Sequence, residues 1–185
     1  AQSPVASFSV NVNTGCSPLS VQFNNTSLNA VSFYWTFGNG NTSNFTNPSN
    51  VYNLSVNYSV TLTAYDANGN TDTKTITNCI TVVQSPTAGF TANALSACEG
   101  YGNIQFTNTS LNYDSCIWDV GDGTTSNLFN PAHTYQLAGV FNVSLIVLKS
   151  QYNCSAILTR SQYITIHPKP YVVIAVDTTV TCDSL

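Results

Sequence analysis

The sequence repeats itself with a spacing of about 83 residues, and this internal repeat constrains the fold more than any other feature. The segment NTSLN occupies positions 25–29 and returns at 108–112. The same spacing relates Trp35 to Trp118. Units of this length are long enough to be complete domains. We therefore expect a series of similar domains in place of one large core.

Two copies are complete and a third begins. Repeat 1 covers residues 1–84, repeat 2 covers residues 85–168, and residues 169–185 open the third copy, where VVIAVDTTVTCDSL lines up with AGFTANALSACEGY of repeat 2. The third copy stops before its tryptophan, so we expect the sequence to be a piece of a longer array. The linkers QSPT and HPKP are short and contain proline, which stiffens a connection. These features predict a semi-rigid, bead-like rod.

Within each repeat the hydrophobic pattern is that of strands. Residues 57–66, NYSVTLTAYD, alternate apolar and polar side chains with a period of two, and FNVSLIVL at 141–148 does the same. The Asn-Gly pair in ANGN at 67–70 predicts a type I′ hairpin turn. No segment keeps a helical period. Several short strands in each repeat of about 80 residues predict an all-β chain of tandem Ig-like β-sandwiches.

The core of each sandwich needs large apolar side chains. Hydrophobic residues make up 43% of the chain and charged residues only 6%, far below the roughly 25% charged residues of an average domain. Trp35 and Trp118, with Tyr52 and Tyr135 at matched positions, are the expected core anchors. The polar surface must then consist mainly of Asn, Thr and Ser.

Composition excludes several classes of partner. The chain has four basic residues and a net charge of −4, so it lacks the cationic patch that nucleic acids require. No apolar run reaches the roughly 20 residues of a membrane span, so we expect no such span in this segment. Six cysteines without methionine favour an oxidising compartment. Because no cysteines form a CxxC pair or a Cys/His cluster, a zinc site is not expected.

The segment CIWDVGDGTTSN at 116–127 has two interpretations. Asp119 and Asp122, together with Asp114, are candidate ligands of Ca²⁺, which prefers several carboxylate oxygens. Repeat 1 has Thr36 and Asn39 in place of the two motif carboxylates and keeps the glycines. The other interpretation is therefore a tight turn with Asp122 as a local cap. Apart from this possible Ca²⁺ we expect no cofactor.

Catalysis is not expected. The chain has two histidines, His133 in NPAHTY and His167 in a linker, and it lacks a GxSxG nucleophile elbow. The alternative role for His133 is a structural hydrogen bond to a neighbouring strand or turn. Asp119 and Asp122 beside one turn do not form the separated carboxylate pair of a glycoside hydrolase. We therefore predict that the chain is not an enzyme.

Several ordered motifs resemble those of the PKD domain family. Repeat 2 shows WDVGDGTTSN, NPAHTY and GVFNVSLIV, and repeat 1 shows WTFGNGNTSN, NPSNVY and VNYSVTLTA. The resemblance covers about residues 5–83 and 87–167. Repeat 1 departs from the family pattern because Asn50 replaces the motif histidine, in addition to the two missing carboxylates.

The resemblance implies a non-catalytic, extracellular structural or adhesive segment of a bacterial cell-surface protein. GCSPLSVQFNNTS also resembles PKD repeats of proteins from gliding bacteria. Its partners would be neighbouring repeats of the same chain, and also glycans, surfaces or other surface proteins. The alternatives are an accessory carbohydrate-binding or spacer module of a secreted hydrolase, and a subunit of a surface filament that assembles by strand addition.

Cysteine connectivity stays open at this stage, because six cysteines allow 15 pairings. An Ig-like topology makes Cys116–Cys154 reasonable, and Cys16–Cys79 would close a large loop in repeat 1. Cys98–Cys154 with Cys116 unpaired is the alternative. Cys98 and Cys182 are otherwise left over.

Two further groups of residues are candidates for contact with sugars. The sequons at Asn57 and Asn142 occupy corresponding places beside the wet face of a strand and are candidate N-glycosylation sites. Exposed aromatic residues can stack on sugar rings, and the possible members of such a row are Tyr34, Tyr52, Tyr101 and Tyr113. The alternative for these tyrosines is packing in the core or at an interface.

Overall fold

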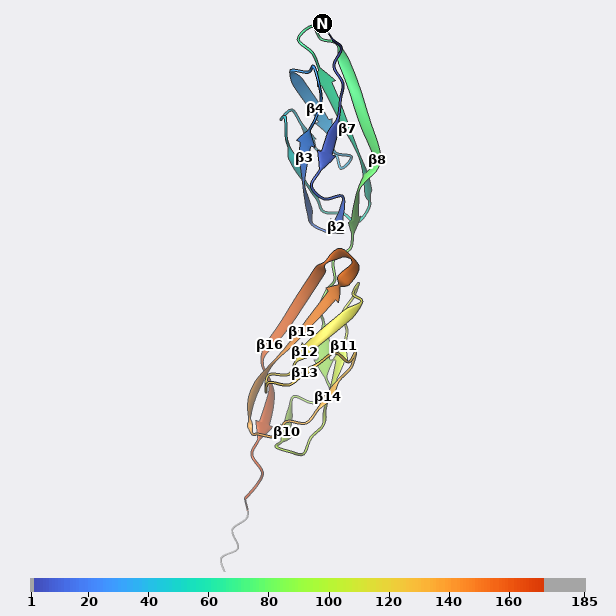
Figure 1. The fold of residues 1–185 in the computed structure, drawn as a ribbon. Helices are drawn as coiled ribbons and strands as arrows, with labels where there is room; N and C mark the ends of the chain where they lie inside the picture. The colour runs from blue at the N-terminus through green and yellow to red at the C-terminus, as the bar shows by residue number, and fades with distance from the viewer. Residues whose placement is uncertain (1, 172–185) are drawn as a thin grey trace, which may run out of the picture.

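The computed structural model describes residues 2–171, and these residues form two β-sandwiches arranged end to end in an elongated molecule (Figure 1). Within this range every regular element is a strand except for one short 3-10 turn, η1 (Ser150–Tyr152). The predicted all-β fold of tandem Ig-like sandwiches is therefore confirmed. Residues 172–185, which carry most of the expected third repeat, lie outside the described residues.

The first sandwich packs a sheet in the order β1-β3-β6 against a sheet in the order β2-β8-β7-β4-β5. Its strands are β1 (Phe8–Val10), β2 (Thr14–Cys16), β3 (Leu19–Asn25), β4 (Ser32–Thr36), β5 (Thr42–Ser43), β6 (Ser49–Tyr52), β7 (Asn57–Tyr65) and β8 (Thr71–Val83).

The second sandwich repeats this arrangement, with sheets in the orders β14-β11-β9 and β10-β16-β15-β12-β13. Its strands are β9 (Phe90–Ala92), β10 (Ser96–Cys98), β11 (Ile104–Asn108), β12 (Ser115–Asp119), β13 (Thr125–Ser126), β14 (Ala132–His133), β15 (Gly139–Lys149) and β16 (Cys154–His167).

Each sandwich contains one parallel strand pair in an otherwise antiparallel fold. In repeat 1, β2 runs parallel to β8 and ends with Cys16 opposite Val83. In repeat 2, β10 runs parallel to β16 and ends with Cys98 opposite His167. Cys16 and Cys98 therefore occupy the same register position in the two repeats.

The two cores are built in the same way around a buried tryptophan. The side chains of Trp35 and Trp118 are completely buried. Phe8 meets the ring of Trp35 edge-on at 5.2 Å between centroids, and Phe90 meets Trp118 at 5.2 Å in the same orientation. Such edge-to-face pairs add to the stabilisation that burial gives.

Hydrogen bonds satisfy the polar atoms of these buried aromatic side chains. The indole N–H of Trp118 donates to the Leu128 carbonyl at 3.0 Å, as that of Trp35 donates to Phe45. Tyr52 and Tyr135 are also buried, and the Tyr135 hydroxyl donates to the Val120 carbonyl at 2.8 Å. The four expected anchors thus pair a large apolar surface with a satisfied polar tip.

The β7–β8 hairpin differs in detail from its prediction. Gly69 has a φ of 85°, whereas Asn68 is absent from the positive-φ residues, so the turn is not of type I′. Its connection is the three-residue loop type with glycine in the left-handed position. Asp66 organises it by accepting hydrogen bonds from the backbone N–H groups of Asn68 and Asn70.

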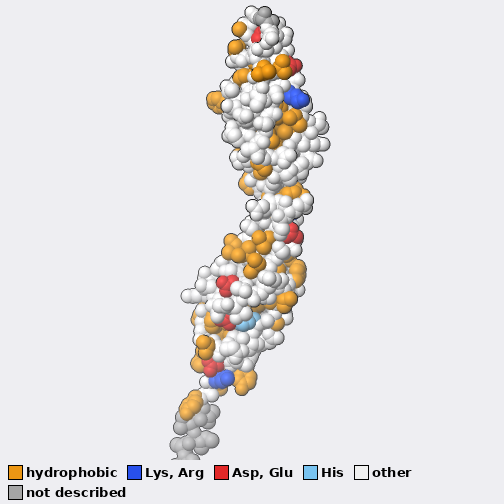
Figure 2. Space-filling view, in the orientation of Figure 1, with side chains coloured by type: hydrophobic (Ala, Val, Ile, Leu, Met, Phe, Trp, Pro, Cys, Tyr) orange, Lys and Arg blue, Asp and Glu red, His pale blue; other side chains and the backbone are white. Residues whose placement is uncertain are grey.

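The surface of the molecule is largely uncharged. Figure 2 shows mostly white, polar or backbone atoms with few acidic and basic side chains along both repeats. Residues 2–171 contain no helix of the length and hydrophobicity that spanning a bilayer would require.

Candidate functional site

The site that stands out is the joint between the two repeats, which a disulfide bond crosses. Cys16 at the end of β2 is bonded to Cys154 at the start of β16, at a sequence separation of 138 and with 6.3 Å between their Cα atoms. The pair therefore links the end of repeat 1 that faces repeat 2 to the adjacent β15–β16 hairpin of repeat 2 (Figure 1).

This bond overturns the expected connectivity. The predicted pairs Cys16–Cys79 and Cys116–Cys154 are wrong, and so is the alternative Cys98–Cys154, because Cys79, Cys98 and Cys116 are free thiols. Cys116 lies in the core of repeat 2, and Cys79 packs against the core of repeat 1. Strand topology within one domain suggested those pairs, but the reach of the β15–β16 hairpin to the neighbouring domain decides the actual one.

Polar contacts accompany the disulfide at the joint. The Lys149 ammonium donates to the Gln84 carbonyl at 3.2 Å, and the Ser85 hydroxyl donates to the Ser17 carbonyl. The linker between the repeats is thus hydrogen-bonded to both of them.

Asp114 fixes the hairpin that carries Cys154. Its carboxylate accepts from the backbone N–H of Ser150 at 2.8 Å and from the Ser150 hydroxyl at 2.9 Å. Burial raises the pKa of Asp114, but the hydrogen bonds from Ser150 outweigh this and hold the pKa below its usual value. Asp114 is therefore an anchor of η1 and belongs to the joint.

The WDVGDG segment forms a tight turn that its carboxylates cap. Asp119 accepts from the backbone N–H of Gly121 at 2.9 Å, and Asp122 accepts from that of Thr124 at 3.0 Å. The second oxygen of Asp122 lies 2.6 Å from Nε2 of His133. Although burial raises the pKa of Asp122, the bonds from His133 and Thr124 hold it below its usual value.

Amide side chains replace these groups in repeat 1. Asn39 accepts from the backbone N–H of Asn41 at 3.1 Å, as Asp122 does from Thr124. The Asn41 amide then donates to Asn50, which takes the place of His133, at 2.8 Å. The same turn thus forms without carboxylates, because Asn and Asp both bond nearby backbone amides.

The three candidate Ca²⁺ ligands do not form one cluster. Asp114 precedes β12 and Asp119 ends it, so about 16 Å of extended strand separates them. In the part of the chain that the structure describes, no three His, Cys, Asp or Glu side chains converge on a common point. The predicted site of Asp114, Asp119 and Asp122 is therefore not assembled.

His133 makes a structural hydrogen bond to a neighbouring turn, as expected in the non-catalytic alternative. Its ring bonds to Asp122 and meets the ring of Tyr135 edge-on at 4.6 Å between centroids. These contacts tie β14 to the WDVGDG turn.

Matching hollows lie in the two repeats beside β4 and β12. The hollow in repeat 1 has a volume of about 390 Å³, and that in repeat 2 about 460 Å³. Every residue that lines the first has its equivalent in the second at the repeat spacing. The first is lined by Ser32, Phe33, Tyr34, Asn44 and Tyr65, and the second by Tyr113, Asp114, Ser115, Cys116, Ile117, Asn127, Phe129 and Leu148.

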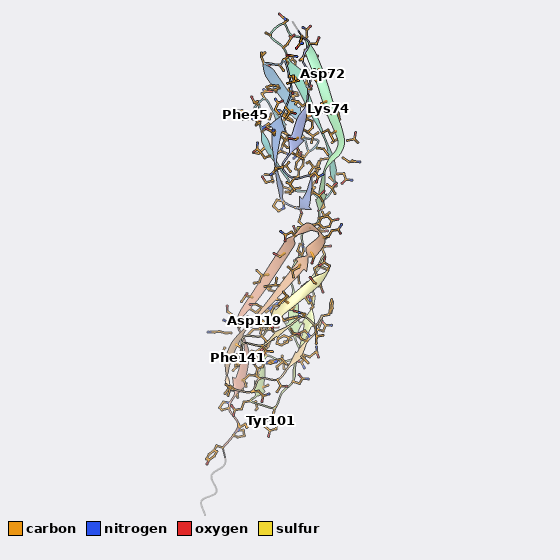
Figure 3. The ribbon with its side chains drawn as sticks, in the orientation of Figure 1. Phe45, Asp72, Lys74, Tyr101, Asp119 and Phe141 are labelled. Carbon is orange, nitrogen blue, oxygen red and sulfur yellow. A yellow bond between two sulfur atoms is a disulfide. The ribbon has the colours of Figure 1, made fainter. Side chains whose placement is uncertain are left out.

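The tyrosines proposed as a sugar-binding row do not form one. Tyr52 is a core residue. Tyr34 and Tyr113 line the two separate hollows, and Tyr101 lies at the far end of repeat 2 (Figure 3).

Asn57 and Asn142, the candidate glycosylation sites, are both exposed. Asn57 opens β7 and Asn142 lies in β15, where its side-chain carbonyl accepts from the backbone N–H of Gln162 at 2.7 Å. The two positions do not correspond as expected, because Asn142 takes the place of Ser59 at the repeat spacing. Glycosylation at both positions stays a prediction.

Comparison with known proteins decides the family. The sequence pattern of the PKD domain matches residues 1–82 and again residues 84–166. The chain belongs to the PKD domain family. Among solved structures, it is similar to the PKD1 domain of the Vibrio cholerae metalloprotease PrtV, with 41% identity over 45% of this chain and 100% of that one, at a TM-score of 0.39. It is also similar to the PKD1 domain of Vibrio anguillarum Epp, with 37% identity over 45% of this chain and 96% of that one, at a TM-score of 0.40.

Family membership fixes the general character of the two domains. PKD domains are in general non-catalytic structural modules, and they occur in extracellular bacterial proteins. The Cys16–Cys154 disulfide is consistent with such a location. The partner that the structure itself shows for each PKD domain is the neighbouring one in the same chain.

Proposed function

We propose that this pair of PKD domains is a non-catalytic, extracellular spacer of a cell-surface protein that holds its neighbours in a semi-rigid line. The observation that carries the proposal is the disulfide between Cys16 and Cys154, which crosses the joint. A spacer needs resistance to bending, and in tandem domains the bending occurs at the joints.

Two covalent connections cross this joint instead of one. The peptide chain passes through the linker after Val83, and the disulfide forms a second connection at Cys16. A single flexible linker permits rotation about any axis, whereas two separated connections restrict it. The Lys149 hydrogen bond to the linker adds a further restraint.

Single-molecule energy transfer between opposite ends of the molecule tests this proposal. The labels are attached at Asn68, in the β7–β8 turn, and at Ala138, next to β15. Both residues are exposed. We expect a narrow distance distribution in the oxidised protein and a broader one after reduction. A C16S/C154S variant should show the broad distribution with or without reductant. Equal widths for the oxidised protein and this variant would refute the spacer role.

The hollow in repeat 1 favours a second function, a contact with glycans. Three aromatic residues, Phe33, Tyr34 and Tyr65, line this hollow together with Asn44. Aromatic faces and amide groups together suit a sugar ring, which has both apolar C–H faces and hydroxyl groups. Tyr34 is 41% exposed, so its ring is open to a ligand.

A pull-down on cellulose and chitin tests this second function, and it also bears on an accessory role beside a hydrolase. We expect the polysaccharide to retain much less of the Y34A variant than of the unmodified protein. Y101A is the matched control, because Tyr101 is an exposed tyrosine outside the hollow. Equal retention of the two variants, or no retention of the unmodified protein, would count against glycan contact through this hollow.

A further inference from the structure

Cys98 in repeat 2 occupies the place that Cys16 occupies in repeat 1. Cys16 is the last residue of β2 and lies opposite Val83 of the parallel strand, and Cys98 is the last residue of β10 opposite His167. The following backbone is held alike, because Ser17 N–H donates to Val83 at 2.9 Å and Glu99 N–H donates to His167 at 3.0 Å.

The chain also leaves the two repeats in the same way. Pro86 follows three residues after Val83, and Pro170 follows three residues after His167. A domain that continues after Pro170 would therefore be connected to repeat 2 as repeat 2 is connected to repeat 1.

Cys98 is the accessible thiol among the described free cysteines. It is exposed, whereas Cys116 is buried and Cys79 is partly buried. Burial raises the pKa of the thiols of Cys79 and Cys116, which lowers their reactivity.

The position of Cys98 is the end of repeat 2 that points away from repeat 1. Figure 1 shows β2 at the end of repeat 1 that faces the joint and β10 at the corresponding far end of repeat 2. Tyr101, three residues after Cys98, is labelled at that end in Figure 3.

We propose that Cys98 is a covalent docking site for a following PKD domain that carries a cysteine at the start of its last strand. That cysteine would occupy the place that Cys154 occupies in repeat 2. The joint between repeats 1 and 2 would then recur as a disulfide ladder along an array. This inference rests on the observed Cys16–Cys154 bond and not on the spacer role.

The sequence supports a PKD domain as the occupant. Residues 171–185 line up with the start of repeat 2, and Cys182 in this segment lies 84 residues after Cys98. Repeat 1, in contrast, has Thr71 at the start of β8, where repeat 2 has Cys154. Only a following domain that resembles repeat 2, with a cysteine at the start of its last strand, could form the disulfide with Cys98.

The bond forms by oxidation of two thiols. Cys98 and the partner cysteine together lose two protons and two electrons as their sulfur atoms join. A small disulfide such as oxidised glutathione takes up both and leaves as two thiols. This exchange runs in the same oxidising compartment that maintains Cys16–Cys154.

An extended chain tests the proposal directly. It consists of residues 1–170 followed by a second copy of residues 87–171, so that the added domain supplies its own Cys154. After refolding in oxidised and reduced glutathione, peptide mapping without reduction should find Cys98 linked to the added Cys154. The control is C154T in the added copy, which gives that domain the threonine that repeat 1 has at Thr71. In this control Cys98 should be fully alkylatable. Free Cys98 alongside an intact Cys16–Cys154 bond would overturn the proposal.

A second experiment uses the 185-residue chain alone. T71C places a cysteine at the start of β8, at the end of the molecule opposite to Cys98, so that two molecules can join end to end. Oxidised glutathione should then produce disulfide-linked oligomers that disappear in T71C/C98S. T73C, at an exposed position two residues further along β8, is the matched control. Equal cross-linking of T71C and T73C, no cross-linking of T71C, or oligomers that persist without Cys98, would contradict the inference.

Discussion

At the residue scale, single glycines show where the backbone leaves no room. Gly121 has a φ of 91°, and a Cβ there would lie 2.2 Å from the Asn142 carbonyl oxygen. Gly38 stands in the same relation to Ser59 in repeat 1, at 2.5 Å. The glycines of the motif therefore permit a close approach of two strands, as well as a left-handed conformation.

Substitution of Gly121 separates these two effects. We expect G121A to destabilise repeat 2 by roughly 2–4 kcal/mol, because it adds a backbone clash to the cost of a left-handed residue. G123A is the control, since Gly123 has a φ of 89° but nothing within 4 Å of its Cβ position. It should cost only about 1–2 kcal/mol. Urea unfolding, with hydrogen exchange of β15 to identify the repeat, distinguishes the variants, and equal losses would refute the clash.

The Asp122–His133 pair predicts how repeat 2 responds to acid. Because the pKa of Asp122 is depressed in the folded protein, its contribution is present above the ordinary Asp pKa of about 3.9. It is lost as the pH falls through the lower folded-state pKa. We expect D122N to lower stability by about 1–2 kcal/mol at pH 7, as for a hydrogen bond to a charged group. Melting curves from pH 7 to pH 2.5 should show this difference shrinking below about pH 4, and a constant difference would contradict it.

At the element scale, the long strands could be predicted from the sequence and the joint could not. β7 alternates along its whole length, with Tyr58, Val60, Leu62 and Ala64 buried, because one face of the strand covers the core. The tryptophan anchors could also be predicted, because the repeat spacing relates Trp35 to Trp118 and both are buried.

The features that escaped prediction depend on contacts between domains or between distant strands. β2 and β10 have three residues each, too few for a periodic signal. The pairing of Cys16 with Cys154 depends on how two finished domains meet, which no local pattern encodes. The hollows are likewise formed by separate strands, although their equivalence follows from the repeat. The matched positions of Cys16 and Cys98 were a signal in the sequence, but they acquired meaning only with the joint in view.

The η1 turn is the element on which the joint depends, and Asp114 holds it. We expect D114A to accelerate hydrogen exchange at the amides of η1 and Asn153, since it removes both acceptors of Ser150. Exchange in β12 and β15 should change little. S115A is the control, because the Ser115 hydroxyl donates its hydrogen bond to Asp114 and not to η1. Unchanged exchange at Ser150 in D114A would show that the carboxylate does not hold the turn.

At the scale of the whole molecule, the disulfide changes the path that a pulling force takes. A force applied at the two ends enters through β1 and β2, crosses from Cys16 to Cys154, and leaves through β16. The chain segment between the two cysteines, whose sequence separation is 138, then lies outside the force path. We call it the shielded segment. Both sandwich cores are largely contained in that shielded segment, so the oxidised spacer should lengthen only through the strands outside it, β1, β2 and β16.

Single-molecule stretching of the chain from its two ends, with and without reductant, measures whether the disulfide carries the force across the joint. We expect reduction to add roughly 50 nm of extension, the fully extended length of the shielded segment. The C16S/C154S variant should show that extension without any reductant. If the oxidised protein already extends by this amount, or if reduction adds nothing, the disulfide does not carry the force across the joint, which would contradict the spacer role proposed for this pair of domains.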